Sequence, residues 1–287
     1  MKAINKNSAH AFMVILAILF GLNFVFIEII VGIAEPYVVL FFSSIAGFVV
    51  TSFIVWLKKI SLKVNFKYIF VMNCMLLFTY IFELIGLQYT TSSNTSFIVQ
   101  LTVLLIPIVS AIVDRRLPAM RSIVLGFIAL IGIAIMTIDP ESLTLNIGDA
   151  LIILVALSFS IYVVMVERTT DSTIAIVFYY FLMGIFLYLG FALLDGLDFY
   201  APFESFGFTL PFIAFVIILM LSLVVQVNVA KFIRPEQMAI YYCLEPITTV
   251  IAAYFILQHA VTPRLAIGGA IIIGAILATR KKIRIRK

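Results

Sequence analysis

The chain alternates long apolar stretches with short polar segments that contain prolines and charged residues. A bilayer core of roughly 30 Å is crossed by a helix of about 20 apolar residues. Ten such stretches fall between breakers such as Pro36, Pro118 and Pro263. The pattern therefore predicts an all-α membrane protein with ten transmembrane helices, roughly at residues 11–33, 37–57, 68–89, 94–113, 121–138, 148–166, 173–194, 209–229, 237–257 and 264–279.

One element of the sequence occurs twice. A constant offset of 143 residues aligns 87–103 with 230–246 and, without a gap, pairs Gly126 with Gly269. In both copies a membrane helix ends, a short polar stretch follows, and a helix with a polar residue in its middle begins. Two similar halves are typical of a membrane transporter. We therefore expect two repeats of five helices, at residues 1–142 and 143–287.

Basic residues are distributed unevenly over the loops between the predicted helices. All Lys and Arg residues except Arg264 fall at the N-terminus, in alternate loops or in the C-terminal tail. The remaining loops carry acids such as Glu35, Asp139 and Asp198. Cytoplasmic loops are enriched in Lys and Arg, so we expect both termini to face the cytoplasm. With five helices in each repeat, the two repeats are inverted relative to each other in the membrane.

The overall composition agrees with a multi-pass membrane protein. Hydrophobic residues make up 64% of the chain and charged residues 11%, and the mean hydropathy is +1.23. Soluble domains are about half apolar and a quarter charged. The net charge of +5 resides in loops and tails, so it indicates orientation rather than a nucleic-acid partner.

The two cysteines and the first apolar stretch have ordinary structural interpretations. Cys74 and Cys243 lie inside apolar stretches, which disfavours a disulfide or a metal site. The first stretch lacks a cleavage site and is expected to be a retained helix.

Three short motifs resemble those of one transporter family. Phe20-Gly21-Leu22-Asn23-Phe24 stands where that family has a Trp-Gly-Ser-x-Phe pattern, with a weaker echo at 159–162. The stretch 86–92 is similar to its Ala-Leu-x-x-Thr-Ser-Ala, and Leu244-Glu245-Pro246 matches its Leu-Glu-Pro, the most specific of these marks. Over nearly its whole length the chain thus resembles EamA-type members of the drug/metabolite transporter (DMT) superfamily.

This resemblance implies ten helices in two inverted five-helix repeats that move a small organic solute by alternating access, without a cofactor. Export is the more common direction in the family. The sequence departs from the family pattern at Thr102-Val103, where many relatives have Thr-Pro. It also departs at 114–116 and 258–260, which replace the usual Gly-Glu-Arg. These departures weaken assignment to a particular subfamily.

Three glutamates inside the predicted helices are candidate functional residues, because ionisable groups in a membrane are costly. Glu245 is the deepest and shares a helix face with Tyr241 and Thr249. Pro246 lacks an amide hydrogen and frees a carbonyl one turn earlier. These residues predict a substrate or proton site in a broken helix. The alternative is a protonated Glu245 that bonds to a neighbouring helix as a structural contact.

The other two glutamates lie nearer the outer side. Glu83 shares a helix face with Tyr80, and the repeat offset pairs it with Gln226. It is expected to line the pathway, or else to act at an outer gate that meets water. Glu28 lies five residues after Asn23 and is a candidate substrate or proton contact, or a residue that reaches the interface.

Further polar residues could supply the few hydrogen-bonding groups of a mostly apolar pocket. Most single Ser, Thr and Tyr residues in a membrane helix only bond to the backbone or lie at a bilayer interface. The candidates are Asn23, Asn94, Gln100, Thr102, Ser158, Tyr162, Tyr179 and Tyr180. Glycines 126, 132, 268, 269 and 274 are expected to permit close helix packing or, in the last helix, a dimer face.

The absence of catalytic sequence patterns favours a transporter over an enzyme. No HExxH, Walker A or G-x-S-x-G pattern occurs. A channel or a structural membrane subunit remains the main alternative, and an intramembrane enzyme is a weaker one. Without an ATP-binding motif the carrier would be secondary, with protons as candidate coupling ions.

The expected partners are the lipid bilayer and a small-molecule substrate. Buried carboxyls and abundant aromatics suit a neutral, zwitterionic or cationic solute such as an amino-acid-like metabolite. No buried Lys or Arg is predicted to receive a phosphate. A bacterial cytoplasmic membrane is the expected location, with the protein as a monomer or a homodimer.

Overall fold

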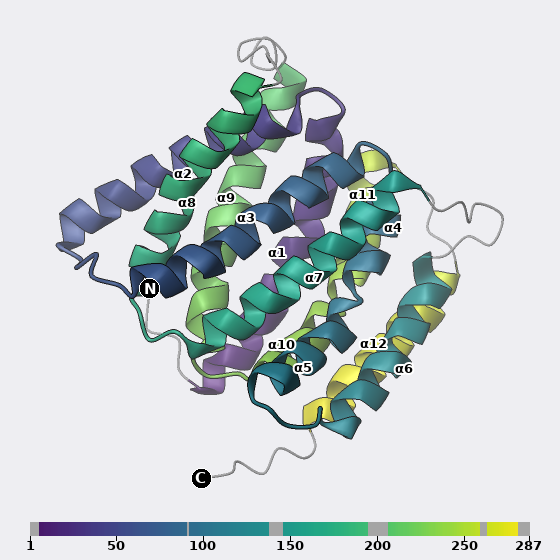
Figure 1. Cartoon of the computed structure of the whole chain (residues 1–287). Coiled ribbons are helices and arrows are strands. Elements are labelled where there is room, and N and C mark those ends of the chain that lie inside the picture. Colours follow the sequence, from purple (N-terminus) through teal and green to yellow (C-terminus); the bar gives the residue numbers. More distant parts are fainter. Residues whose placement is uncertain (1–5, 91, 138–145, 195–205, 259–262, 281–287) are drawn as a thin grey trace.

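The computed structural model describes residues 6–90, 92–137, 146–194, 206–258 and 263–280, and these residues form α-helices joined by short loops (Figure 1). In chain order the helices are α1 (Lys6–Val31), α2 (Pro36–Lys58), α3 (Phe66–Leu87), α4 (Ser92–Val99), α5 (Thr102–Val113), α6 (Met120–Thr137), α7 (Ile147–Arg168), α8 (Thr173–Leu194), α9 (Phe206–Ala230), α10 (Pro235–Tyr242), α11 (Glu245–Leu257) and α12 (Arg264–Arg280). Within the described ranges there is no strand, which confirms the all-α fold class.

The helix ends follow ordinary capping chemistry. Pro36 opens α2, where its missing amide hydrogen leaves no bond unmade. Asn146 and Asp149 form a capping box at the start of α7, with reciprocal bonds of 3.1 Å and 3.0 Å between side chain and backbone. Lys59 ends α2 in the left-handed conformation, with a φ of 49°. These local signals fix where the chain turns between long apolar helices.

Eight described segments are long and apolar enough to cross a membrane, and they match eight of the ten predicted spans. The other two predicted spans coincide with α6 and α12, whose apolar parts are shorter, at Met120–Ile135 and Ile267–Ala278. The count of ten crossing helices therefore stays a prediction. The outer faces carry large exposed apolar side chains such as Trp56 and Phe186, at 74% and 71% exposure, which suits contact with lipid.

Two of the predicted spans are interrupted helices. The span predicted at 94–113 is divided into α4 and α5, and that at 237–257 into α10 and α11. At each break backbone amides bond to carbonyls three residues back, as in a tight turn. They are those of Gln100, Leu101, Val103 and Leu104 at the first break, and those of Cys243 and Leu244 at the second. Pro246 accounts for the second break because it has no amide hydrogen to donate. The sequence predicted a broken helix at Pro246, whereas the break at Gln100, where no proline stands, was not predicted.

The helices pack in a pattern that repeats when the two halves are exchanged. α3 packs on α7, and its counterpart α9 packs on α1. Likewise α5 packs on α7 while α11 packs on α1, and the pairs α2–α8 and α6–α12 each join equivalent helices. This exchange of partners is what a two-fold relation between the repeats requires. In Figure 1, α6 and α12 run side by side at one edge of the bundle.

Close backbone approach between α1 and α11 depends on Gly21. A Cβ at this position would lie 2.2 Å from Thr248 Oγ1 and 2.8 Å from the carbonyl oxygen of Glu245. Thr249 donates a hydrogen bond of 3.2 Å to the carbonyl of Gly21 across the same contact. A similar approach joins α6 to α12, where a Cβ at Gly132 would lie 2.9 Å from the Gly268 carbonyl. Glycine thus sets how closely the break before α11 lies against α1.

Replacing Gly21 by alanine should destabilise the protein, because the added methyl group meets backbone that has no room to yield. We expect Gly21→Ala to lose about 1–3 kcal/mol, the usual cost of overpacking a close contact. Thermal unfolding of the purified protein in detergent measures the effect. Gly190→Ala is the matched control, since a Cβ there meets nothing within 4 Å. Equal losses of melting temperature in the two variants would contradict the packing argument.

Candidate functional site at the two helix breaks

The two interrupted helices are joined by a side-chain hydrogen bond at their breaks. Gln100, between α4 and α5, donates from Nε2 to Oε2 of Glu245, the first residue of α11, over 3.0 Å. Both side chains are buried, at 0% and 3% exposure. The sequence indicated Gln100 only as one of several weaker candidates, and the structure makes it the direct partner of Glu245.

A central cavity brings together four of the residues predicted for the site. Glu245, Glu83, Tyr80 and Asn23 all line it. The rest of its wall is mostly apolar and aromatic and consists of Phe20, Phe24, Leu76, Thr79, Val99, Val155 and Phe159. A mostly apolar pocket with a few convergent polar groups is the usual form of a small-molecule site.

The cavity is narrow in this form of the protein. Its volume of about 30 Å³ is room for a water molecule or two, since one water needs about 10–15 Å³ by this measure. Phe20 and Phe159 in its wall meet edge to face, with ring centroids 5.9 Å apart, and both rings also contact Tyr242. A metabolite would therefore require these helices to separate.

Several buried acceptor oxygens around the breaks have no hydrogen-bond donor among the described residues. They include Oε1 of Glu245, Oε1 of Gln100 and Oδ1 of Asn23. An unsatisfied buried acceptor costs about 1–3 kcal/mol. The residues that line the cavity include two carboxyl groups and no Lys, Arg or His. The site therefore suits a proton, or a solute that donates hydrogen bonds or carries positive charge.

Thr248 and Thr249 hold the start of α11 against α1. Their hydroxyls donate to the carbonyl of Glu245 at 2.9 Å each, and Thr249 also reaches the carbonyl of Gly21. Thr249 was predicted as a polar group on the face of Glu245. Its contacts in the structure are to backbone, so it fixes the position of Glu245.

The remaining predicted residues lie outside the cavity wall. The Tyr241 hydroxyl lies 3.0 Å from Nδ1 of His10 on α1. Tyr162 is buried beside Phe159, with ring centroids 6.2 Å apart. Thr102 is buried at the start of α5, the position that the repeat offset pairs with Glu245. Glu28 lies on α1 with one buried carboxyl oxygen that lacks a donor among the described residues.

The weaker candidate residues either make structural contacts between helices or lie next to residues of the cavity wall. Ser158 and Thr79 join α7 to α3 by a hydroxyl pair at 2.9 Å. Tyr179 donates to the carbonyl of Leu62, and Tyr180 packs against Tyr80. The side chain of Asn94 lies outside the described residues.

Sequence reasoning missed the walls of the cavity more than its polar groups. Thr79 stands one turn before Glu83, a spacing that could have placed it on the same face. Phe20 and Phe24 flank Asn23 at helical spacing and were considered only as part of a family motif. An apolar wall resembles any other packed face, so the sequence gives it no separate signal.

The fold and the buried polar site define a multi-pass helical membrane protein built from two repeats. A sequence model of the EamA-like transporter family matches residues 7–138 and, a second time, residues 146–280. The chain therefore belongs to the EamA-like transporter family. This match confirms the resemblance to EamA-type members of the DMT superfamily and supports a transporter rather than an enzyme. The domain boundary at 142 stays a prediction.

Comparison with other known proteins supports the fold of the chain and not its function. No curated protein matches the chain. Among solved structures, 24 chains match this one. One of them, described as a crystal structure of a protein, superposes on this chain with a TM-score of 0.80. It is 16% identical in sequence, and the match covers 96% of this chain and 97% of that one. At this identity the likeness establishes a shared fold.

The bond between Gln100 and Glu245 should appear as an energetic coupling. In a double-mutant cycle with Gln100→Ala and Glu245→Ala, we expect a coupling of about 1–2 kcal/mol in the free energy of unfolding, because each change removes the other residue's partner. Unfolding by SDS titration in mixed micelles measures it. A cycle of Asn73→Ala with Glu245→Ala is the control, since Asn73 donates to Ile176 on α8 instead. Indistinguishable couplings in the two cycles would refute the contact.

Proposed function

We propose that this protein is a secondary transporter that moves a small organic metabolite by alternating access. The observation that carries the proposal is the central cavity, where two interrupted helices from different repeats meet through Gln100 and Glu245. Transporters with inverted repeats bind their substrates near the midplane at such discontinuous helices. Family membership supports the same class of function.

The proposed substrate is a neutral, zwitterionic or cationic solute such as an amino-acid-like metabolite. Glu83 and Glu245 offer negative charge or hydrogen-bond acceptors, while Phe20, Tyr80 and Phe159 offer aromatic faces. Aromatic faces attract cations. Because no Lys or Arg lines the cavity, a phosphorylated solute would find no cationic partner there. Export is proposed as the direction, in line with the family resemblance.

The proposed orientation places both termini in the cytoplasm of a bacterial cell. The distribution of basic residues supports it, because the end of the bundle that holds Lys63, Arg116 and Arg168 would face the cytoplasm. The two repeats then lie inverted across the membrane. α6 and α12 would complete ten crossings, since their outer faces are apolar.

The proposed coupling ion is the proton, and Glu245 is its proposed carrier. A carboxylate in the middle of a membrane is costly to ionise. When the site opens to water, ionisation becomes easier, so a carboxyl group whose exposure alternates can bind and release a proton. Gln100 donates to one oxygen of Glu245 in the closed form, and the other oxygen lacks a donor among the described residues.

Purified protein in liposomes should move its substrate with saturable kinetics and without ATP, because a carrier binds solute before each crossing. A panel of labelled amino acids, amines and neutral metabolites, measured for uptake and efflux, identifies the substrate class. Empty liposomes are the control. Flux that rises linearly with solute concentration would point instead to a channel, and no flux for any member of the panel would oppose a transporter of this substrate class.

Glu245→Gln should abolish acceleration of transport by a proton gradient while substrate exchange persists. Glutamine keeps the size and much of the hydrogen bonding of the protonated acid but carries no titratable proton. Transport with and without an imposed pH gradient measures the effect. Glu35→Gln is the matched control, since Glu35 is an exposed residue that precedes α2. Gradient-driven transport of wild-type magnitude in Glu245→Gln would rule out its role as proton carrier and favour Glu83.

A further inference from the structure

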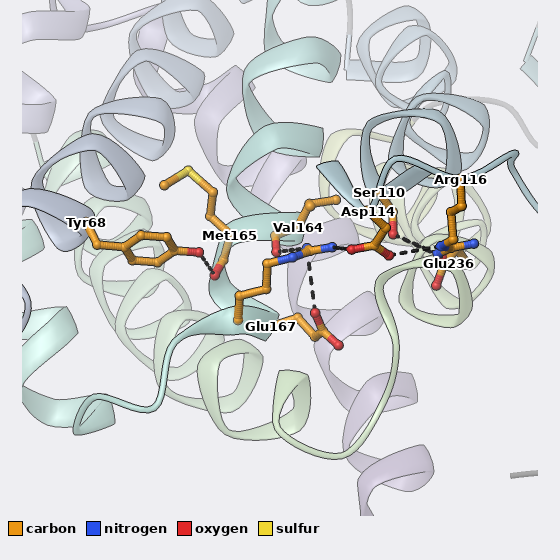
Figure 2. Close-up of polar contacts among 9 residues, drawn as sticks. Tyr68, Ser110, Asp114, Arg116, Val164, Met165, Glu167 and Glu236 are labelled. Atoms are coloured by element: carbon orange, nitrogen blue, oxygen red, sulfur yellow. Dashed lines mark hydrogen bonds and ion pairs between the residues drawn. The ribbon is translucent and has the colours of Figure 1, made fainter. Parts of the chain in front are cut away.

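A network of charged side chains lies where three helices meet at one end of the bundle (Figure 2). Asp114 and Arg116 follow the end of α5, Glu167 and Arg168 end α7, and Glu236 stands in the first turn of α10. These residues border a cleft of about 440 Å³, together with Ser110, Arg234 and Pro235. The cleft is far larger than the central cavity.

Two guanidinium groups hold this network together. Arg168 donates to Oδ1 of Asp114 at 2.6 Å, and Arg116 donates to Oδ2 of the same carboxylate at 2.9 Å. Hydrogen bonds from Arg168 and then Arg116 lower the pKa of Asp114 below its ordinary value. Asp114 therefore stays ionised at neutral pH, and both ion pairs persist there.

Arg116 also links the end of α5 to the start of α10. Its guanidinium contacts Oε1 of Glu236, and Ser110 donates to the same oxygen at 3.0 Å. Glu236 is buried, at 8% exposure, so the loss of its cationic partner would leave an uncompensated charge. The contact therefore opposes separation of α5 from α10.

These two half-helices connect the charged cleft to the central cavity. Glu236 precedes Glu245 by nine residues, which corresponds to about 13 Å along a helix. α5 and α10 pack against each other along this path. The network therefore ties together the ends of α5, α7 and α10 at the start of this path.

The opposite end of the bundle lacks the same residues. The repeat offset pairs Asp114, Arg116 and Glu236 with Leu257, His259 and Ser93. No acid and arginine pair can form among those three. Among the residues that the structure describes, ion pairs therefore occur at this mouth and not at the other, so the network distinguishes the two sides.

We infer that the network of Asp114, Arg116, Arg168 and Glu236 is a gate that holds this mouth shut and favours the form of the carrier closed on that side. In the proposed orientation this is the cytoplasmic side. The inference rests on the proposed alternating-access function. Its residues lie outside the central cavity, so the gate controls access and not substrate recognition.

Thiol accessibility in membrane vesicles tests the gate without any substrate. Val99→Cys, on a background with Cys74→Ala and Cys243→Ala, places a reporter in the wall of the central cavity. Right-side-out and inside-out vesicles are treated with a membrane-impermeant maleimide. In a separate variant, Ser61→Cys marks the side of the charged mouth. It lies in the loop before α3, and Tyr68 in the first turn of α3 donates to Met165 near the end of α7 at 2.7 Å. Adding Arg116→Gln should raise the labelling rate of the reporter from that side about tenfold.

Arg115→Gln is the matched control because it removes the same charge from the same loop. Arg115 makes no ion pair among the described residues. In the Arg115→Gln variant the reporter cysteine should therefore be labelled at the same rate as in the parent. Glu236→Gln provides a second test that retains the bond from Ser110 and should raise labelling as Arg116→Gln does. Unchanged labelling in both gate variants, or an equal rise in Arg115→Gln, would overturn the inference. If the liposome assay fails instead, with labelling as expected, the proposed function fails while the gate stands.

Discussion

The need to satisfy polar groups inside an apolar solvent governs the centre of this protein. Each break in a membrane helix frees backbone groups, and here both breaks are buried in protein rather than exposed to lipid. Tight turns bond the amides of Gln100, Leu101, Cys243 and Leu244, and Gln100 bonds to Glu245 across the gap. The two threonines that follow Pro246 secure α11 to α1. These hydrogen bonds satisfy the polar groups that the breaks free, so interrupted helices can line a cavity inside the bundle.

The two repeats share a fold but contribute differently to the site. The first repeat supplies most of the cavity wall, from Phe20 through Glu83 to Val99, while the second supplies Val155, Phe159 and Glu245. The residue equivalent to Glu245 in the first repeat is Thr102, which lies outside this wall. Likewise, within the described ranges the ion pairs lie at one mouth, in the network of Arg116 and Glu236. The two repeats thus have nearly the same backbone arrangement but different side chains at equivalent positions.

Much of this arrangement was predictable from the sequence, because a membrane imposes strong rules. The ten apolar stretches all coincide with helices, eight of them long and apolar enough to cross a membrane. The depth of Glu245 and Glu83 indicated residues that the structure brings to one cavity. The break at Gln100 was not predictable, since no proline marks it. Nor was the contact of Tyr241 with His10, because helical spacing shows which residues share a face but not which helix that face meets. Nor were the ion pairs of Arg116, because the sequence showed this residue only as a loop charge and as part of a departure from the family pattern.

The exchange of packing partners between the repeats determines which parts of the molecule can move as units. α1 lies against α9 and α11, and Gly21 lets α1 approach the start of α11 closely. α7 lies in the same way against α3 and α5. Any motion that preserves these contacts must carry α1, α9 and α11 as one rigid body and α3, α5 and α7 as another. Each body then contains helices from both repeats, so the mechanical division of the protein cuts across the division of its sequence.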